Sequence, residues 1–509
     1  MTAAAPLLAL WLTPALWLAL PDFILEDGPT GLWITLAVSL IPLIAVGVGR
    51  TATAEREAQW AAPFAASALV LVTGLLAWAN LALAGDLAAG LGAPRWQGIA
   101  VAAGAAWLFT TWRGAGRIIP ALLLAGALLL AVPSADLVRE AGVDPLRAWD
   151  RVAAEAAFRF PARSAWVTSG QDMGRARGRT DLVFDEEHRV TAPSGGVLRS
   201  RSSDGGGVSE REWSLAPGQS VTFRAGDRLL EPLALPLRFE AGKRVPGAPP
   251  SGAAWAAGGP IDWGRAADLH VTLVMGGVAL LCTGATRSFP RRAVLMLGAA
   301  LLAVSLWAQG WAIYGALGAP DVFLGGVTVG RLAEMRAAPP ARQALGGLVL
   351  ASAIMSFAAS MIALRDRVTA LDARASGHVT RRPLAWVALF GAAALAGLYG
   401  ADPWSILMLA FGTAAASLGP ATLWPPERSG AATAAGAVGL ALFVVLAALG
   451  ALQSVAPEAV RVSRPASVAA LWTAALDHPV LAALVAGAAV LWAFGRPARP
   501  RRRQVRGAA

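Results

Sequence analysis

The sequence predicts a polytopic α-helical integral membrane protein of about twelve transmembrane helices, with an inserted extracytoplasmic antiparallel β-sandwich or barrel domain. Three observations predict this fold class. First, 56% of the 509 residues are hydrophobic and 15% are charged, whereas soluble proteins carry roughly 25% charged residues. Second, apolar segments long enough to cross a bilayer fill most of the chain. Third, the segment 134–266 between them is polar and Gly-rich, with the alternation of β-strands.

Apolar length divides the chain into four regions. Residues 1–133 should hold about five membrane helices, 134–266 the extracytoplasmic domain, 267–495 about seven further helices, and 496–509 a basic cytoplasmic tail. The expected spans are 4–21, 30–48, 62–84, 97–112, 117–133, 267–285, 292–316, 342–364, 383–400, 403–419, 430–453 and 477–495. Only Ala401 and Asp402 separate the two spans 383–400 and 403–419, and the Asp402-Pro403 step breaks the helix there, because proline disfavours a helical residue before it.

Arginine predicts the orientation, because cytoplasmic loops carry an excess of basic residues. It gathers in alternate loops and in the tail, which places both termini in the cytoplasm and 134–266 outside the inner membrane of a bacterium. The arginines on the cytoplasmic side are Arg50, Arg56, Arg113, Arg117, Arg287, Arg291, Arg292, Arg365, Arg367, Arg374, Arg381, Arg382, Arg496, Arg499, Arg501, Arg502, Arg503 and Arg506.

Aromatic residues mark the same boundaries, because Trp and Tyr favour the membrane–water interfaces. We therefore interpret most of the 20 tryptophans as interface anchors rather than as a cofactor cage. Those at expected outer ends are Trp33, Trp96, Trp311, Trp404 and Trp472, with Tyr314 and Tyr399, and those at inner ends are Trp60, Trp112, Trp386, Trp424 and Trp492.

The extracytoplasmic domain should begin with a short amphipathic helix over 144–157. Asp144 is its expected N-cap and Pro145 its first residue. Its apolar face would combine Leu146, Trp149, Val152 and Ala153. A β-rich part, 164–240, follows, with strand-like runs at 164–168, 181–185, 189–192, 196–201, 208–214, 220–224, 228–231 and 235–240. The Pro/Gly-rich connector 244–264 should be extended.

Chemistry-bearing residues are sparse in this domain. His188 is its one histidine, and we expect a solvated position in a hairpin turn, with Asp185, Glu186 and Glu187 as a charged hairpin tip. One imidazole with scattered carboxylates does not make a metal site. The chain's single cysteine, Cys282, excludes an intramolecular disulfide. The sequence therefore predicts no cofactor and no metal.

A basic surface on the strands is the best candidate for a partner. Arg199 and Arg201 should lie on the same side of one strand because alternate residues share a face. With Arg211 and Arg224 they could form a face for an anionic partner. The net charge of +11 does not indicate nucleic acid, because the basic residues lie in short clusters beside apolar segments.

The membrane region is informative by what it lacks. Ionisable residues inside spans mark proton relays and ion pathways, and Asn80, Gln309 and Gln453 are polar but expected near helix ends. No Walker A sequence is present. A proton-coupled transporter and a built-in ATPase are disfavoured, while a passive or partner-driven transporter stays an alternative.

Two resemblances supply further alternatives. Asp22, Glu26 and Asp27 follow the first span, and the chain is similar there to polytopic glycosyltransferases that use polyprenyl-phosphate donors. That resemblance implies that an acid in the first outer loop acts as general base or metal ligand. The many spans with a large outer domain also resemble cytochrome c assembly proteins, which implies haem ligation by His270 and His478. The Trp-Trp-Asp pattern of that family is absent, and Asp262-Trp263-Gly264 stands nearest to it.

The leading expectation is therefore non-catalytic. We expect a multi-pass inner-membrane protein that serves as an envelope scaffold or assembly subunit. Its partners would be the lipid bilayer and a protein bound at the outward-facing β-rich domain.

Overall fold

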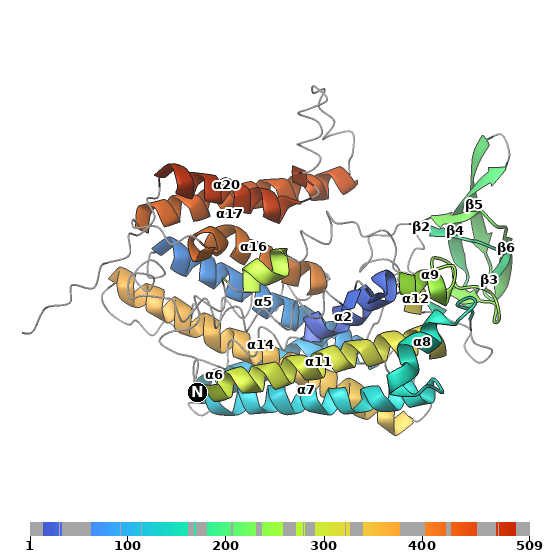
Figure 1. Ribbon diagram of the computed structural model, residues 1–509, viewed down its shortest axis with the longest axis horizontal. Coiled ribbons are helices and arrows are strands. Elements are labelled where there is room, and N and C mark those ends of the chain that lie inside the picture. The colour runs from blue at the N-terminus through green and yellow to red at the C-terminus, as the bar shows by residue number, and fades with distance from the viewer. Residues whose placement is uncertain are drawn as a thin grey trace, which may run out of the picture.

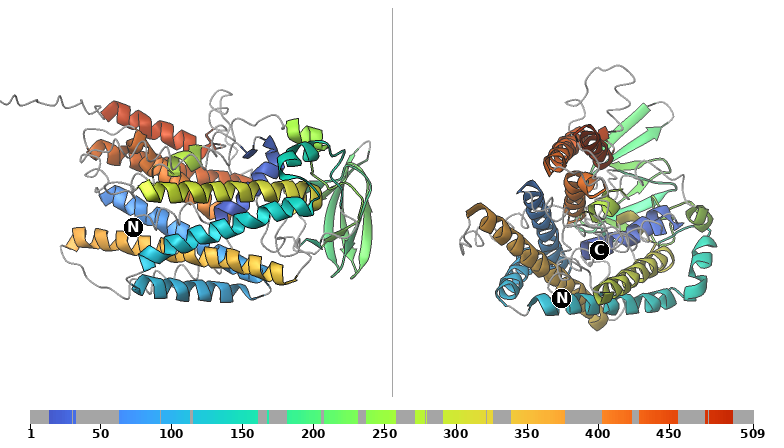
Figure 2. Two further views of the ribbon diagram at one scale, coloured as in Figure 1. Left: turned by 60° about the horizontal axis from the view of Figure 1, so that its bottom comes forward. Right: turned by 60° about the vertical axis from the view of Figure 1, so that its left-hand side comes forward.

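The computed structural model is mostly helical and carries small antiparallel sheets at one end of the helices (Figures 1 and 2). The structure describes residues 14–29, 31–32, 63–91, 93–112, 115–160, 167–168, 181–204, 207–230, 237–257, 271–277, 279, 291–320, 322–325, 339–376, 403–423, 429–455, 475–476 and 478–494. The expected span 383–400 and all of 30–48 except residues 31–32 lie outside these residues, and only part of 4–21 and of 267–285 is among them.

The helical part consists of elongated helices that run side by side (Figure 1). They are α2 (Pro14–Asp27), α5 (Pro63–Gly90), α6 (Arg95–Thr111), α7 (Ala115–Glu140), α11 (Arg291–Gly318), α14 (Pro339–Ser376), α16 (Pro403–Leu423), α17 (Ser429–Val455) and α20 (Pro479–Phe494), with the short α12 (Val322–Gly325).

Five of these helices contain segments long and apolar enough to cross a membrane, as far as the described residues go: Ser67–Ala89, Ala121–Glu140, Gly298–Gly318, Gly346–Arg365 and Gly430–Leu449. The segments Ile406–Pro420 and Pro479–Phe494 are apolar but shorter. The described residues thus contain five candidate spans, whereas the sequence predicts about twelve over the whole chain.

Most described helix starts agree with the apolar pattern, whereas α2, α5, α7 and α14 end later than expected. Helix α16 begins at Pro403, as the Asp402-Pro403 step predicts. Helix α7 continues to Glu140, past the expected end of the membrane region at 133, and this last part combines buried Leu137 and Val138 with charged residues. Helix α2 likewise continues to Asp27 and does not end at 21.

Small residues allow the helices to approach closely. A Cβ atom on Gly98 of α6 would lie only 2.3 Å from the carbonyl oxygen of Ala84 in α5. A Cβ atom on Gly310 of α11 would lie 2.6 Å from the Cβ of Ser134 in α7. Close backbone approach at small residues is the usual packing device of helices in membranes.

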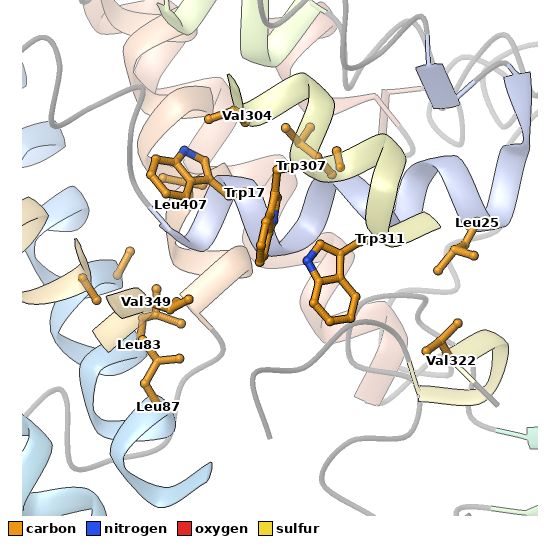
Figure 3. Close-up of a cluster of buried hydrophobic side chains, with 14 of the residues drawn as sticks. Trp17, Leu25, Leu83, Leu87, Val304, Trp307, Trp311, Val322, Val349 and Leu407 are labelled. Atoms are coloured by element: carbon orange, nitrogen blue, oxygen red, sulfur yellow. The ribbon is translucent and has the colours of Figure 1, made fainter. Parts of the chain in front are cut away.

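Large aromatic side chains fill the centre of the helical part. Trp17 of α2 and Trp307 and Trp311 of α11 are almost fully buried (Figure 3). The Trp307 and Trp311 rings meet edge to face at 5.4 Å, and Tyr314 adjoins Trp311 at 6.0 Å. The expectation that Trp311 and Tyr314 anchor at the outer interface is wrong, because α11 is covered by neighbouring helices on this face.

Other tryptophans have the exposure that interface anchoring requires. Trp96 and Trp112 lie at the two ends of α6, and Trp492 lies near the end of α20. All three are exposed, Trp492 by 80%. The exposure of these helix-end tryptophans is compatible with interface anchoring, whereas the burial of Trp311 and Tyr314 is not.

Eight short strands form two four-stranded antiparallel sheets. The sheet order is β1-β8-β3-β6 in one and β2-β7-β4-β5 in the other. Each strand coincides with or overlaps a predicted run. The strands are β1 (Val167–Thr168), β2 (Asp181–Val183), β3 (His188–Ala192), β4 (Gly196–Asp204), β5 (Gly207–Leu215), β6 (Gln219–Phe223), β7 (Arg228–Leu230) and β8 (Leu237–Phe239). We call 167–239 the β-domain.

Side chains from the two sheets meet in a shared apolar core. Phe184, directly after β2, stacks on Phe223 of β6 with ring centroids 4.7 Å apart. Val190 of β3 and Leu198 of β4 alternate with exposed neighbours and are buried as well. Alternating burial of this kind is typical of strands with one face against a core.

Two segments beside the β-domain differ from expectation. The predicted helix 144–157 is a 3₁₀ turn, η1 (Pro145–Arg147), followed by α8 (Ala148–Ala153), and Asp144 caps it by accepting from the Leu146 amide. Leu146 is 93% exposed rather than on the apolar face, because the 3₁₀ turn breaks the helical period. The connector 244–264 is not wholly extended, since it contains helix α9 (Gly252–Ala257).

Candidate functional site

The β-domain joins the helices through two paired segments, 158–160 and 242–245, which we call the neck. The Phe160 amide donates to the Lys243 carbonyl at 2.8 Å, and the Gly242 amide donates back to the Phe160 carbonyl at 2.8 Å. The Val245 amide donates to the Phe158 carbonyl at 2.9 Å. The entry and exit of the domain are thus held together as a short antiparallel ladder.

Carboxylates of the turn between β2 and β3 bind this neck. Glu186 accepts the backbone amide of Arg244 at 2.6 Å and lies 3.9 Å from the Arg159 guanidinium. Asp185 forms a 3.0 Å ion pair with Arg244. The donated amide, assisted by the Arg159 charge, lowers the pKa of Glu186. Two of the three acids expected at a hairpin tip therefore tie the sheets to the neck.

His188 lies directly behind this contact, and the expectation of a solvated turn residue is wrong. It is the first residue of β3 and is 0% exposed. Its ring approaches Phe184 at 5.2 Å and Phe160 of the neck at 6.4 Å, and neither ring nitrogen has a hydrogen-bond partner. Desolvation lowers the pKa of His188. It is an ionisable group in an apolar core.

A second contact joins the segment after the neck to helix α2. The Trp255 indole of α9 donates to the Leu25 carbonyl of α2 at 3.1 Å and stacks on Trp149 of α8 at 5.2 Å. Gly28 follows α2 with φ of 57°, and a Cβ there would lie 2.2 Å from the Trp255 carbonyl oxygen. We call Leu25, Gly28, Trp149 and Trp255 the lock.

The lock escaped prediction for a clear reason. Trp255 lies in a Pro/Gly/Ala-rich stretch where periodicity gives no signal. A solvated connector does not need a bulky indole. The presence of Trp255 in this stretch is therefore the one signal in the sequence that indicates a docked segment.

The candidate acids Asp22, Glu26 and Asp27 lie in the last two turns of α2, not in a loop. They share this helix end with Leu25, whose carbonyl accepts the Trp255 indole. The three acids are therefore close in sequence to Leu25 and Gly28 of the lock. Among the described residues, no group of three or more His, Cys, Asp or Glu could hold a metal ion.

The four candidate arginines do not share one surface. Arg199 and Arg201 are exposed on one face of β4, as alternation predicts, between buried Leu198 and Ser200. Arg211 is paired in register with Ser200, so it lies on the opposite face of the sheet. Arg224 follows β6 in the other sheet.

Carboxylates accompany the two arginines that do lie together. Arg199 faces Glu212 of β5 at 3.4 Å, and Arg201 faces Glu210 at 2.5 Å. All four side chains are 44–61% exposed. The resulting ladder of alternating charge, Arg199, Arg201, Glu210 and Glu212, is named the charged face.

Of the two histidines suggested for haem, His478 alone lies among the described residues. His478 directly precedes α20, and its Nδ1 atom is buried without a hydrogen-bond partner. His270 lies outside the described residues.

Polar residues of the spans are deeper than expected. Asn80 lies within the span Ser67–Ala89 and is 1% exposed, and its amide donates to the Leu76 carbonyl at 2.9 Å. Gln309 lies within Gly298–Gly318 and donates to Ser305 at 3.4 Å. The expectation that both lie near helix ends is wrong, because α5 and α11 are longer than the apolar pattern indicates.

Fold and site together define a class: a mostly helical protein with helices apolar enough for a membrane and small antiparallel sheets fixed at one end of them. No protein-family model matches the chain, and no curated protein matches its sequence. Its function is therefore inferred from the chemistry of the neck, the lock and the charged face.

Proposed function

We propose that this protein is an envelope scaffold or assembly subunit of a bacterial inner membrane, with about twelve spans and an outward-facing β-sandwich that binds a protein partner. The observation that carries the proposal is the anchoring of the β-domain at two places. The neck holds its sheets, and the lock holds the following segment on α2. A rigid mount that leaves the charged face exposed suits docking.

The proposed orientation is supported by which helix ends meet. Three contacts join ends that the arginine pattern assigns to a single side. Gly315 of α11 approaches Leu25 and Val322, and Gly346 of α14 approaches Leu91 after α5, at the outer ends. Arg365 of α14 donates to the Thr110 carbonyl of α6 at the inner ends. The directions of these helices agree with alternating loops.

The charged face favours a partner whose own surface carries both signs of charge. Cross-strand pairs keep the arginines and glutamates in fixed positions, so a partner can match them one by one. Strand β5 is also an edge strand of its sheet. Its Glu210, Arg211 and Glu212 protect that edge against addition of another strand, so we expect the partner to dock by side chains rather than by strand addition.

Co-purification of the tagged full-length protein from membranes tests the proposal. Charge reversal by Arg199→Glu with Arg201→Glu should reduce the retained partner at least about ten-fold, because like charges across an interface cost several kcal/mol. The matched control is Arg189→Glu with Arg238→Glu, which reverses two exposed arginines on the other sheet and should leave the partner bound.

A second control separates binding from folding. Adding Glu210→Arg and Glu212→Arg to the double reversal restores opposite charges across the strands while inverting the charged face. Binding should stay lost. Recovery of binding would show that the reversal acted through the hairpin itself, and the absence of any co-purifying protein with the unaltered chain would refute a scaffold.

One observation favours a second function, a transferase acting on a lipid-linked polyprenyl-phosphate substrate. The helix that carries Asp22, Glu26 and Asp27 ends at the lock, where the outer domain could cover a substrate. For this function, Asp22→Asn, Glu26→Gln or Asp27→Asn should abolish transfer from a labelled polyprenyl-phosphate sugar while the protein still inserts normally. A scaffold should tolerate all three changes.

A further inference from the structure

The neck is held by charges on its surface and by an imidazole beneath it. His188 is enclosed by the rings of Phe160 and Phe184 and by the strand pairing that sets it opposite Phe223. Phe160 in turn stacks on Phe239 of β8 at 5.3 Å. The imidazole therefore lies where the neck, the end of β2, β3, β6 and β8 meet.

None of the described residues around His188 accepts a hydrogen bond from its ring, so no acceptor stabilises a second proton there. Both ring nitrogens are buried and without a hydrogen-bond partner among the described groups. The charged groups that act on the ring are Glu186, Asp185, Glu240 and Lys243. The two acids of the turn already bind Arg244, Glu186 through its amide and Asp185 through its guanidinium. A cation at His188 would be buried and unpaired, which is costly.

We propose that His188 is an acid-sensitive latch: its protonation loosens the contact between the β-domain and the neck, so mild acid releases the domain from its fixed position on the membrane helices. The neutral ring keeps Phe160 packed on the sheets. The charged ring draws water or must move out, and either event separates Phe160 from Phe184 and Phe239.

The direction of the pH effect follows from proton binding. The pKa of His188 is lowered in the folded state, so the unfolded or opened state binds more protons below its ordinary value of about 6.5. The latch is therefore fully closed above about pH 6.5 and weakens as the pH falls. One proton changes the opening equilibrium by at most about ten-fold per pH unit.

Among the side-chain types present in the segment 134–266, histidine alone has an ordinary pKa in this range. The chain has 4 histidines, of which only His188 belongs to the segment 134–266, and its single cysteine lies elsewhere. Ordinary carboxylates titrate near pH 4, and the pKa of Glu186 is lowered further by its bond to Arg244. A response between about pH 6.5 and 5.2 therefore reports on His188.

Hydrogen exchange of the full-length protein in nanodiscs tests the latch. Protection of amides in β3, β6 and the neck, corrected for the intrinsic exchange rate at each pH, should fall by up to about five-fold from pH 6.5 to 5.5, because about half of the opened state is already protonated at pH 6.5. His188→Leu and His188→Gln should each abolish this decrease, the first by restoring an apolar side chain and the second by a polar but uncharged one. His478→Gln should leave the decrease unchanged.

Several results would overturn the latch. Constant protection of the unaltered protein from pH 7.5 to 5.2 would exclude it, whether or not the variants fold. An equal decrease in either His188 variant would assign the response to another group. Loss of protection throughout α5 and α14 as well would indicate general unfolding and not a release at the neck.

Discussion

At the scale of single residues, the close approach of Gly28 to Trp255 constrains how α9 packs on the end of α2. The chain leaves α2 with a positive φ of 57°, which favours glycine. A Cβ atom would also meet the Trp255 carbonyl oxygen at 2.2 Å. Any larger residue must either strain the backbone or push α9 away, and the indole of Trp255 would then lose its bond to Leu25.

Gly28→Ala should therefore destabilise the protein more than conformational strain alone explains. Gly142→Ala is the matched control, because Gly142 has φ of 75° but open space around its Cβ direction. We expect a cost of about 1–2 kcal/mol for the control and about 1–3 kcal/mol more for Gly28→Ala. Thermal unfolding of the detergent-solubilised protein measures the destabilisation in both variants. Equal decreases in the unfolding temperature would show that α9 can move away from residue 28 at no cost.

At the scale of elements, the pair α5–α6 shows how a helix that is only weakly amphipathic packs against its neighbour through one face. Gly98, Ala102 and Ala106 of α6 recur every four residues and are all buried. Val101, Trp107 and Leu108 on the remaining surface are exposed. The buried face consists mostly of small residues, with Ile99 beside them, and the exposed face carries the larger apolar side chains, as in helices that pack within lipid.

Substitution of the two glycines of α6 should have opposite effects. Gly98→Ala places a Cβ 2.3 Å from the Ala84 carbonyl oxygen and should cost about 1–3 kcal/mol. Gly104→Ala meets no atom within 4 Å and should stabilise the helix by about 0.5–1 kcal/mol. The unfolding temperatures of the two variants test this prediction. An unchanged unfolding temperature for Gly98→Ala would mean that α6 does not pack on α5 at Gly98.

At the scale of the whole molecule, the sheets lie beyond one end of the helices (Figure 2). Helix α14 extends away from that end to Ser376, whereas Ser203 lies in β4. If the helices cross a membrane as we propose, these two serines lie on opposite sides of it.

Thiol labelling tests this arrangement. In a Cys282→Ala background, which removes the chain's single cysteine, Ser203→Cys should react with a membrane-impermeant maleimide in intact spheroplasts. Ser376→Cys should react only after permeabilisation. Labelling of both variants from the same side would refute the proposed topology.

Local pattern predicted much of the fold. Helices α5, α6, α11 and α17 and all eight strands overlap their expected ranges, because apolar length and alternation are properties of consecutive residues. The prediction failed where helices continue through charged residues, at the ends of α2, α5, α7 and α14, and where a 3₁₀ turn shifts the face of Leu146.

The amino-acid sequence by itself determined the class of protein, the positions of most apolar helices and the strands of the β-domain, since each depends on neighbours along the chain. Tertiary structure alone decided the burial of His188, the neck and the lock, because these depend on residues distant in sequence. Glu186 and Arg244 are 58 residues apart, and Leu25 and Trp255 are 230 apart. No periodicity within one segment encodes which distant segment will cover it.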